Sequence, residues 1–272
     1  MIHFSPAKIN LGLQVLERRE DGFHELRSVM YPTGLCDIIE IHQLPAGEGP
    51  IRFSQSGIRF ESDLEKNLCI KAWKLVRGEG ELPGVAIHLH KQIPVGAGLG
   101  GGSSNASTVI IGLNPLLSDS LNPEEMAQLA GQLGSDCPFF LHNSPRMMEG
   151  RGEVLSPSGV SLDKLYLVIL FPDIHISTAE AFGGLTPAYP ELHLRELLDA
   201  PIDRWKNLII NDFEKSAFNT YPLLKELKNA LFRAGAIYAS MSGSGSSLYG
   251  IFRSPPKLPE SIQKFVIWTG PA

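Results

Sequence analysis

The chain has 272 residues, of which 43% are hydrophobic and 19% charged, and its formal net charge is -5. This composition is typical of a folded globular protein, and the length suits one large domain or two lobes. The mildly acidic balance disfavours a nucleic-acid partner. The longest apolar run, residues 165–171, is far shorter than the roughly 20 residues that span a bilayer. We therefore expect a cytoplasmic protein with neither a nucleic-acid nor a membrane partner.

The three cysteines carry no pairing signal. Cys36, Cys69 and Cys137 are odd in number, widely spaced and never in a C-x-x-C arrangement. This pattern disfavours a disulfide framework and a zinc site, so we expect three reduced thiols.

The first ninety residues alternate mainly between strands and turns. Period-two hydrophobicity predicts strands, and the Glu-Asp-Gly triplet at 20–22 predicts a turn. One segment instead shows helical spacing. The predicted elements are strands at 2–15, around 39–41, at 51–53 and at 85–90, and a helix at 67–77.

The second part of the chain alternates helices and strands. Asn122 is a good N-cap, with Pro123 at the first helical position and Glu125 where a capping-box acid would sit. A polar, proline-containing stretch at 155–163 is the best boundary, which divides the chain into 1–155 and 156–272. The other predicted elements are helices at 104–117, 202–218 and 222–233, and strands at 165–171, 237–241 and 248–252.

A glycine-rich segment between a predicted strand and a predicted helix carries the clearest chemical signal. Residues 94–106 read PVGAGLGGGSSNA, with five glycines. Glycine lets the backbone approach a ligand closely, and the following helix start offers unpaired N–H groups to an anion. Ser103 and Ser104 could cap this helix, contact a phosphate oxygen or approach a magnesium ion. The segment therefore predicts a phosphate-binding loop.

Other interpretations of the glycines fit less well. A flexible linker has no reason to lie between a patterned strand and a patterned helix. Residues 96–101 satisfy G-x-G-x-x-G, but no acidic residue ends a strand about 20 residues later, as a dinucleotide site requires. The Walker pattern also fails, because no Lys-Ser or Lys-Thr pair follows.

The loop resembles the central motif of the superfamily named for galactokinase, homoserine kinase, mevalonate kinase and phosphomevalonate kinase, the GHMP kinases. Residues 5–11, SPAKINL, resemble its first motif, and residues 241–247, MSGSGSS, resemble its third, a glycine turn beside the phosphate loop. Two further segments, DGFHEL at 21–26 and GSDCPFF at 134–140, resemble the branch that phosphorylates a methylerythritol carrying a cytidine diphosphate. Galactokinases and mevalonate kinases do not resemble this chain at the Gly-Phe-His segment.

The resemblance implies roles for particular residues. Asp136 matches the catalytic aspartate, which would accept or orient the proton of the attacking hydroxyl, and Lys8 matches the lysine paired with it. ATP would bind to the loop, with magnesium whose ligands the sequence does not identify. The implied ATP-binding residues are Pro94, Gly96, Gly98, Leu99, Gly100, Gly101, Gly102, Ser103 and Ser104.

The substrate side follows the same resemblance. Phe23 and His24 match a cytidine-recognition pair, in which an aromatic ring stacks on the base and the histidine binds its edge. The family usually has tyrosine at the first position, so Phe23 keeps the ring and loses a hydroxyl. Phe182 resembles the second aromatic ring, which would stack on the other face of the base. A phenylalanine that only packs in the core would give the same sequence pattern. Asn10 resembles a substrate contact, and an early-strand asparagine could equally satisfy local backbone groups.

We accordingly expect an α+β fold of two lobes. The N-terminal lobe would mix strands and helices around the phosphate loop, and the C-terminal lobe would be of α/β type. The expected activity is ATP-dependent phosphorylation of the 2-hydroxyl of the cytidine-diphosphate substrate. The alternatives are another small-alcohol kinase of the superfamily and a non-catalytic nucleotide-binding module. A metal pair at His88 and His90 is disfavoured, because no third ligand lies nearby in the sequence.

Overall fold

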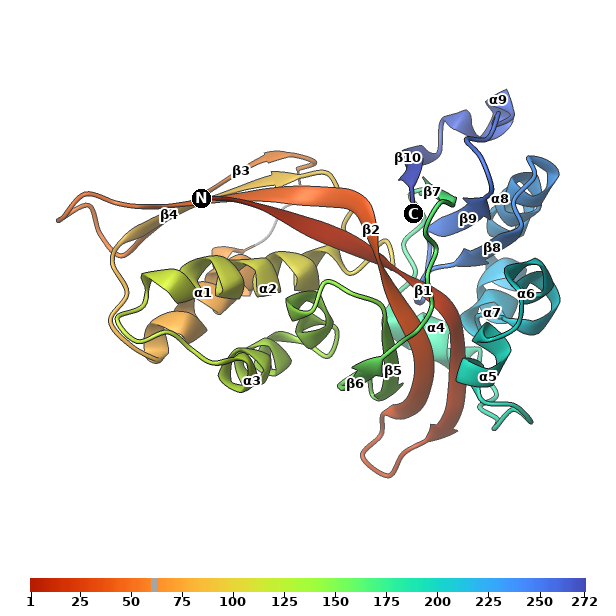
Figure 1. The fold of residues 1–272 in the computed structure, drawn as a ribbon, viewed down its shortest axis with the longest axis horizontal. Helices are drawn as coiled ribbons and strands as arrows, with labels where there is room; N and C mark the ends of the chain where they lie inside the picture. Colours follow the sequence, from red (N-terminus) through yellow and green to blue (C-terminus); the bar gives the residue numbers. More distant parts are fainter. Residues whose placement is uncertain (60–62) are drawn as a thin grey trace. The chain divides into compact units, whose positions relative to one another are not determined.

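The computed structural model describes residues 1–59 and 63–272, which form two compact units (Figure 1). Unit 1 comprises Met1–Ala7, Leu35–Val95 and Gly100–Asn143, and unit 2 comprises Lys8–Gly34, Gly96–Leu99 and Ser144–Ala272. The long strands β1 (Ile2–Arg18) and β2 (His24–Gln43) contribute residues to both units. The mixture of helices and strands confirms the predicted α+β class. The boundary predicted between residues 155 and 156 stays a prediction.

Unit 1 is a sheet covered by helices. Strand β3 pairs in parallel with β4, and β4 pairs antiparallel with residues 38–43 of β2. Helices α1, α2 and α3 lie along one side of these strands in Figure 1. The further elements of unit 1 are β3 (Ile51–Gly57), α1 (Leu68–Gly78), β4 (Val85–Lys91), α2 (Gly101–Leu113), α3 (Pro123–Leu133), and 3₁₀ turns at Leu64–Lys66, Asn114–Leu116 and Cys137–Leu141.

The core of unit 1 joins the sheet to α2. Ile39, Ile87 and Leu89 of the strands pack with Val109 and Leu113 of the helix. Alternation along the strands and the 3.6-residue period of the helix bring these side chains to one layer.

Unit 2 contains an antiparallel sheet in the order β10-β7-β9-β8. Helix α8 packs on this sheet through Leu224, Leu227 and Leu231. Residues 26–30 of β2 pair with β5, and β5 pairs with β6. The elements of unit 2 are β5 (Arg146–Gly150), β6 (Val154–Pro157), β7 (Tyr166–Leu170), α4 (Thr178–Gly183), α5 (Leu194–Leu198), α6 (Ile202–Leu208), α7 (Phe213–Thr220), α8 (Pro222–Arg233), β8 (Tyr238–Met241), β9 (Leu248–Phe252), α9 (Glu260–Gln263) and β10 (Val266–Pro271).

Several sequence predictions are confirmed at the level of single residues. Asn122 caps α3, Pro123 occupies its first turn, and Glu125 completes the capping box. Helix α8 spans Pro222–Arg233 as predicted, and Gly235 follows it with φ of 97°. These signals are local in the chain, which is why they can be identified without a structure.

The single helix predicted at 202–218 is wrong. The chain forms α6 and α7 instead, separated by an extended segment. The amide of Leu13 donates to the carbonyl of Ile210 at 3.0 Å, and the amide of Asp212 donates to the carbonyl of Leu13 at 2.9 Å. Pairing with β1 therefore replaces helical hydrogen bonds at the break.

The helix predicted at 104–117 is displaced. Helix α2 begins three residues earlier, at Gly101, because Gly100 takes a left-handed conformation that starts the helix. It ends at Leu113, and residues 114–116 form a 3₁₀ turn that contains Pro115. Proline lacks the N–H that a continuing α-helix would need.

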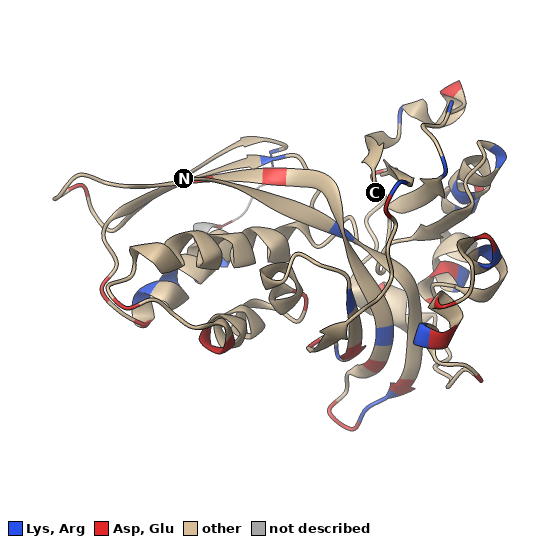
Figure 2. Ribbon diagram, viewed as in Figure 1, with Lys and Arg blue, Asp and Glu red and all other residues tan. Residues whose placement is uncertain are grey.

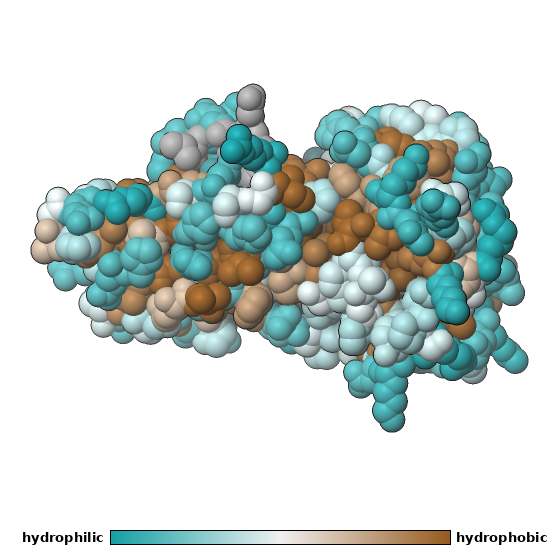
Figure 3. Space-filling model, turned by 90° about the horizontal axis from the view of Figure 1, so that it is seen from above, coloured by the Kyte–Doolittle hydropathy of each residue, from teal (hydrophilic) through white to brown (hydrophobic). Residues whose placement is uncertain are grey.

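Charged and apolar residues are mixed on the surface. Figure 2 shows lysine and arginine interspersed with aspartate and glutamate on many elements, as the near balance of the composition suggests. Figure 3 shows apolar residues among polar ones on the face in view. Within the described residues, the structure contains no helix that is both long and apolar enough to cross a membrane.

Candidate phosphate and substrate sites

The glycine-rich loop has the backbone conformation that an anion site requires. Gly96, Gly98 and Gly100 have φ of 69°, 76° and 68°. Gly100 is the N-cap of α2 and provides no capping side chain, so the first N–H groups of the helix remain for another acceptor. With the positive end of the helix dipole at this point, the loop is suited to bind phosphate oxygens.

Within unit 2, the first half of the loop packs against the turn at residues 242–247. The Ser242 hydroxyl donates to the carbonyl of Gly98 at 2.9 Å, and the Ser247 amide donates to the carbonyl of Ala97 at 3.1 Å. A Cβ atom at Gly98 would lie 2.2 Å from the carbonyl oxygen of Ser242. The predicted packing of the third motif beside the phosphate loop is therefore confirmed.

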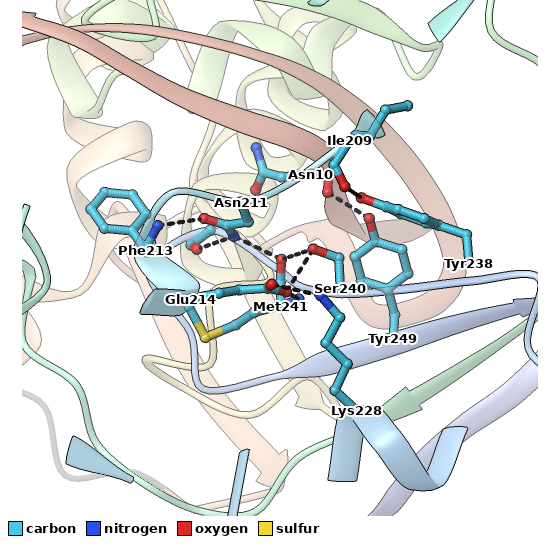
Figure 4. A network of polar contacts seen from close by, with 11 residues as sticks. Asn10, Ile209, Asn211, Phe213, Glu214, Lys228, Tyr238, Ser240, Met241 and Tyr249 are labelled. Carbon is cyan, nitrogen blue, oxygen red and sulfur yellow. Dashed lines mark hydrogen bonds and ion pairs between the residues drawn. The ribbon is translucent and has the colours of Figure 1, made fainter. Parts of the chain in front are cut away.

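Two buried residues that sequence reasoning missed hold this turn in place (Figure 4). The Asn211 side chain donates to the carbonyls of Met241 and Gly243, both at 2.8 Å. Glu214 accepts from the Ser240 hydroxyl at 3.0 Å and the Met241 amide at 2.8 Å. Their position as polar residues inside an amphipathic segment could have indicated a buried polar role. Their partners could not be identified, because they lie about 30 positions away in the chain.

In unit 1, a buried polar network supports the start of α2. The Asp37 carboxylate accepts from the Lys91 ammonium, from the amides of Gln92 and Ile93, and from the Asn105 amide group at 2.8 Å. Burial lowers the pKa of Lys91, and the Asp37 carboxylate opposes that shift. Asn105 is thereby anchored in the second turn of α2.

The same network includes a serine of the predicted phosphate site. The Ser5 hydroxyl donates to the Ser104 hydroxyl at 2.8 Å, and Asn105 donates to Ser5 at 3.0 Å. Ser104 is fully buried. The structure thus gives its side chain a role that the sequence did not suggest, which is to anchor the helix start through Ser5, and its backbone amide donates to the carbonyl of Gly100.

Removing one partner of the buried ion pair should destabilise unit 1 strongly. The side chains of Lys91 and Asp37 are 2% and 0% exposed, so Lys91→Met would leave a buried carboxylate without its counter-charge. We expect a loss of about 3–5 kcal/mol in the free energy of unfolding, measured by urea denaturation. Lys71→Met on the exposed side of α1 is the matched control and should change stability by less than about 0.5 kcal/mol. A loss in Lys91→Met no larger than that in Lys71→Met would contradict the expected cost of an uncompensated buried carboxylate.

Asp136 lies at the N-cap position of the 3₁₀ turn Cys137–Leu141 and is half-buried. The residue after it is anchored to α2, because the Ser107 hydroxyl donates to the carbonyl of Cys137 at 2.7 Å. Burial raises the pKa of Cys137 to about 11, and the nearby Ser103 hydroxyl opposes that rise. Asp136 and the loop serines thus belong to one packed region of unit 1.

Lys8 and Asn10 lie together in unit 2. The Lys8 ammonium donates to the Asn10 side-chain oxygen at 2.5 Å, and the Asn10 amide group donates to the Ser28 hydroxyl at 2.8 Å. Ser28 in turn donates to the carbonyl of Gly12 at 2.5 Å. This chain of buried hydrogen bonds fixes the direction of the Lys8 side chain. The pairing of Lys8 with Asp136 joins residues of different units and stays a prediction.

The structure brings two of the three predicted cytidine-binding side chains into direct contact. The rings of His24 and Phe182 are stacked, with centroids 4.5 Å apart and planes at 18°. The rings of Phe182 and Phe213 form a T-shaped pair with centroids 4.9 Å apart, so Phe182 also packs at the boundary of the core. Burial lowers the pKa of His24, and Arg18 adds to that shift.

Phe23 is 55% exposed, and the guanidinium of Arg151 lies over its ring at 5.0 Å. The ring is therefore on the surface, where a ligand can reach it. Arg151 was not identified from the sequence, because its approach depends on the pairing of β2 with β5.

The remaining chemical candidates have structural roles. His88 and His90 bond the hydroxyls of Ser54 and Ser56 on the neighbouring strand β3. Within the described part of the chain, no three His, Cys, Asp or Glu side chains form a possible metal site. All three cysteines are free thiols, as predicted.

Two family descriptions match the chain. GHMP kinases N terminal domain matches residues 67–144, and GHMP kinases C terminal matches residues 194–266. Among curated proteins, the 4-diphosphocytidyl-2-C-methyl-D-erythritol kinase of Azobacteroides pseudotrichonymphae is 45% identical over 256 residues, 94% of each chain. The enzyme of the same name from Bacteroides thetaiotaomicron is 44% identical over 261 residues, 96% of this chain and 95% of that one.

Solved structures agree with these matches. A crystal structure of 4-(cytidine 5'-diphospho)-2C-methyl-D-erythritol kinase is 32% identical, with a TM-score of 0.82 over 99% of this chain and 98% of that one. A mevalonate kinase structure, 15% identical with a TM-score of 0.68 over 97% of this chain and 93% of that one, shares the fold alone.

Proposed function

Because the chain belongs to the 4-diphosphocytidyl-2-C-methyl-D-erythritol kinase family of GHMP kinases, we propose that it transfers the γ-phosphoryl group of ATP to the 2-hydroxyl of 4-diphosphocytidyl-2-C-methyl-D-erythritol. The observation that carries the proposal is the series of positive-φ glycines opening α2, which suits a polyphosphate. The reaction supplies a phosphorylated intermediate of isoprenoid precursor synthesis. The cytoplasmic location stays a prediction.

ATP binds, in this proposal, through the backbone N–H groups of residues 98–103, since the Ser104 amide already donates to the carbonyl of Gly100. Backbone donors suit this task because they are fixed before the ligand arrives and need no reorganisation during transfer. Pro94, Gly96 and Leu99 shape the approach to the loop: Leu99 is buried, and its carbonyl accepts from the Lys8 amide at 2.9 Å. This hydrogen bond therefore connects the loop to β1 at Lys8, the lysine proposed for catalysis.

Asp136 accepts or orients the proton of the attacking hydroxyl, and Lys8 stabilises negative charge on the transferring group. The hydrogen bond to Asn10 holds the Lys8 ammonium in one direction, and Ser28 holds Asn10. Asn10, which the resemblance places on the substrate side, therefore also positions the lysine.

Magnesium fits the site mainly through the phosphate oxygens of ATP. The described residues offer no preformed cluster of three acidic or histidine ligands, and Ser104 is already bonded to Ser5. Among the residues proposed above for unit 1, the Asp136 carboxylate and the Ser103 hydroxyl carry oxygens of the kind that would hold such an ion. When bound, magnesium neutralises charge on the phosphates.

The cytidine group is held by Phe23, His24 and Phe182. The His24 ring covers one face of Phe182, so a base that stacks on Phe182 must use its other face or displace His24. Exposed Phe23 offers a second aromatic face. A neutral His24, favoured by its lowered pKa, can both donate to and accept from the edge of the base.

An ADP-release assay on a panel of alcohols tests the proposed activity. The panel contains the diphosphocytidyl substrate, free methylerythritol phosphate, homoserine and mevalonate. We expect turnover of the first alone, with competition by cytidine diphosphate. Turnover of another alcohol in preference to it would reassign the substrate, and ATP binding without turnover of any alcohol would exclude kinase activity.

Replacing His24 should affect the cytidine substrate and leave ATP almost unaffected. Loss of base contacts of this kind costs about 1–3 kcal/mol, so His24→Ala should raise KM for the substrate roughly 5- to 150-fold. His42→Ala, an exposed histidine on β2, is the matched control. Steady-state kinetics with each substrate varied in turn provide the measurement. A change confined to KM for ATP would show that the pocket is wrongly assigned.

A further inference from the structure

The glycine-rich loop has no polar side chain of its own at residues 94–102, which read PVGAGLGGG. Its backbone N–H groups suit phosphate oxygens, but a Walker loop also carries a lysine that reaches the phosphates, and this loop has none. Side-chain donors to phosphates on its first half, residues 96–99, must therefore come from segments packed against it. Lys8 is one such residue of unit 2, because its amide donates to the carbonyl of Leu99.

His175 is a second residue of this kind, and it lies outside the motifs that the sequence analysis singled out. It belongs to the segment between β7 and α4. Its ring packs on Gly96, the first glycine of the loop, because a Cβ atom at Gly96 would lie 3.5 Å from His175 Nδ1 and 3.8 Å from its Cε1. Both residues belong to unit 2. The fold therefore brings an imidazole into van der Waals contact with the start of the loop.

The backbone around His175 is held by its two neighbours. Ile176 is buried in the core of unit 2, and Ile174 packs against that core. Ile176 also lies close to the turn at residues 242–247, since a Cβ atom at Gly245 would lie 3.1 Å from Ile176 Cδ1. His175 itself is exposed. Its side chain is therefore directed away from the core, at a position that the packing of both isoleucines fixes.

The ring nitrogens of His175 are available to a ligand. Among the described residues, the ring has no hydrogen-bond, ion-pair or aromatic partner. An imidazole carries at least one N–H in either protonation state, so it can always donate. Other histidines of unit 2 are occupied: the ring of His24 is stacked on another ring, and His193 bonds Glu149 at 3.3 Å. Packing thus places an unoccupied donor on the phosphate loop.

We propose that His175 is a further ATP-binding residue, whose imidazole N–H donates to an oxygen of the polyphosphate on the loop. This role rests on the function proposed above. Hydrogen bonds to an ionised phosphate are shorter and stronger than those between neutral groups, so one such donor adds measurably to affinity. The diphosphate of the cytidine substrate is the same kind of acceptor. ATP is the source we assign, because the ring lies on Gly96 of the loop that is proposed to hold ATP.

Calorimetric titration of the full chain with the non-hydrolysable ATP analogue AMP-PNP and magnesium tests this role without requiring turnover. We expect His175→Ala to bind AMP-PNP at least about tenfold more weakly than the unchanged chain. His175→Gln keeps a side-chain N–H and should bind within about threefold of the unchanged chain. His42→Ala, which replaces an exposed histidine of β2, is the matched control and should have unchanged affinity. An AMP-PNP affinity of His175→Ala within about twofold of the control would overturn the proposal.

Competition experiments identify the group that His175 contacts. Displacement of AMP-PNP by tripolyphosphate should become weaker in His175→Ala by the same factor as AMP-PNP binding. Displacement by adenosine, and direct binding of cytidine diphosphate, should not change. If adenosine or cytidine diphosphate bound more weakly to His175→Ala while tripolyphosphate did not, the assignment to the phosphates of ATP would be wrong.

The role of His175 and the kinase activity can fail separately. Suppose that His175→Ala weakens AMP-PNP binding by about tenfold but the unchanged chain turns over no alcohol. His175 would then bind phosphate in a chain without kinase activity. Turnover of the diphosphocytidyl substrate with the same KM for ATP in His175→Ala would instead exclude the role of His175 and leave the proposed activity intact.

Discussion

Gly98→Ala is expected to lower the free energy of unfolding by more than about 3 kcal/mol and to raise KM for ATP at least about tenfold. Two costs combine at this position. Gly98 has φ of 76°, where alanine is strained, and its Cβ would lie 2.2 Å from the carbonyl oxygen of Ser242 and 2.9 Å from that of Gly245. Both contacts are to backbone, so neither can be relieved by rotating a side chain.

Gly22→Ala separates these two costs. Gly22 has φ of 85° and no atom within 4 Å of the added Cβ, so only the strain of about 1 kcal/mol remains. Urea denaturation of both variants, followed by ATP kinetics on whichever folds, gives the comparison. If Gly98→Ala proved as mild as Gly22→Ala, the loop and the turn at residues 242–247 would not be in the close contact described.

Asp136→Asn is expected to reduce kcat by about 10²- to 10⁴-fold, the range for loss of a general acid or base. The amide is nearly the same size as the carboxylate, so the fold and the ATP affinity should change little. Measurement requires single-turnover kinetics together with a separate titration of an ATP analogue. Near-normal turnover would remove Asp136 from the mechanism.

Asp119→Asn is the matched control for this experiment. Asp119 is an exposed aspartate of unit 1, outside every site proposed above. Its replacement changes the net charge by the same amount as Asp136→Asn. A similar fall in kcat in both variants would indicate a general effect of charge and would contradict a specific role for Asp136.

The sequence identified those features of the site that depend on neighbouring residues in the chain. Five glycines ahead of a helix predict positive φ and an open helix start, since both follow from the absence of a side chain. The capping box at Asn122 and the turn between β8 and β9 also depend only on residues close together in the chain. The resemblance to GHMP kinases then connected these separate segments into one expected activity.

The buried polar networks could not be predicted in this way. Asp37 gains its partners only when β2 pairs with β4 and α2 packs beside them, which joins positions 54 and 68 residues apart. The local sequence predicts Asn211 and Asp212 to be helical. In the structure the helix is broken here because the segment pairs with β1, and the Val15–Asp212 contact joins positions 197 residues apart. Local propensity was overridden by these tertiary hydrogen bonds.

By itself, the sequence predicted the fold class, because hydrophobic period and glycine placement are local signals. Its contiguous motifs, through their resemblance to GHMP kinases, indicated the family and the residues that are proposed for the chemistry. Tertiary structure alone decided which side chains hold them: Ser28 behind Asn10, and Asn211 and Glu214 behind the turn at residues 242–247. The physical reason is burial, because a polar group removed from water must find a partner in space, wherever that partner lies in the chain.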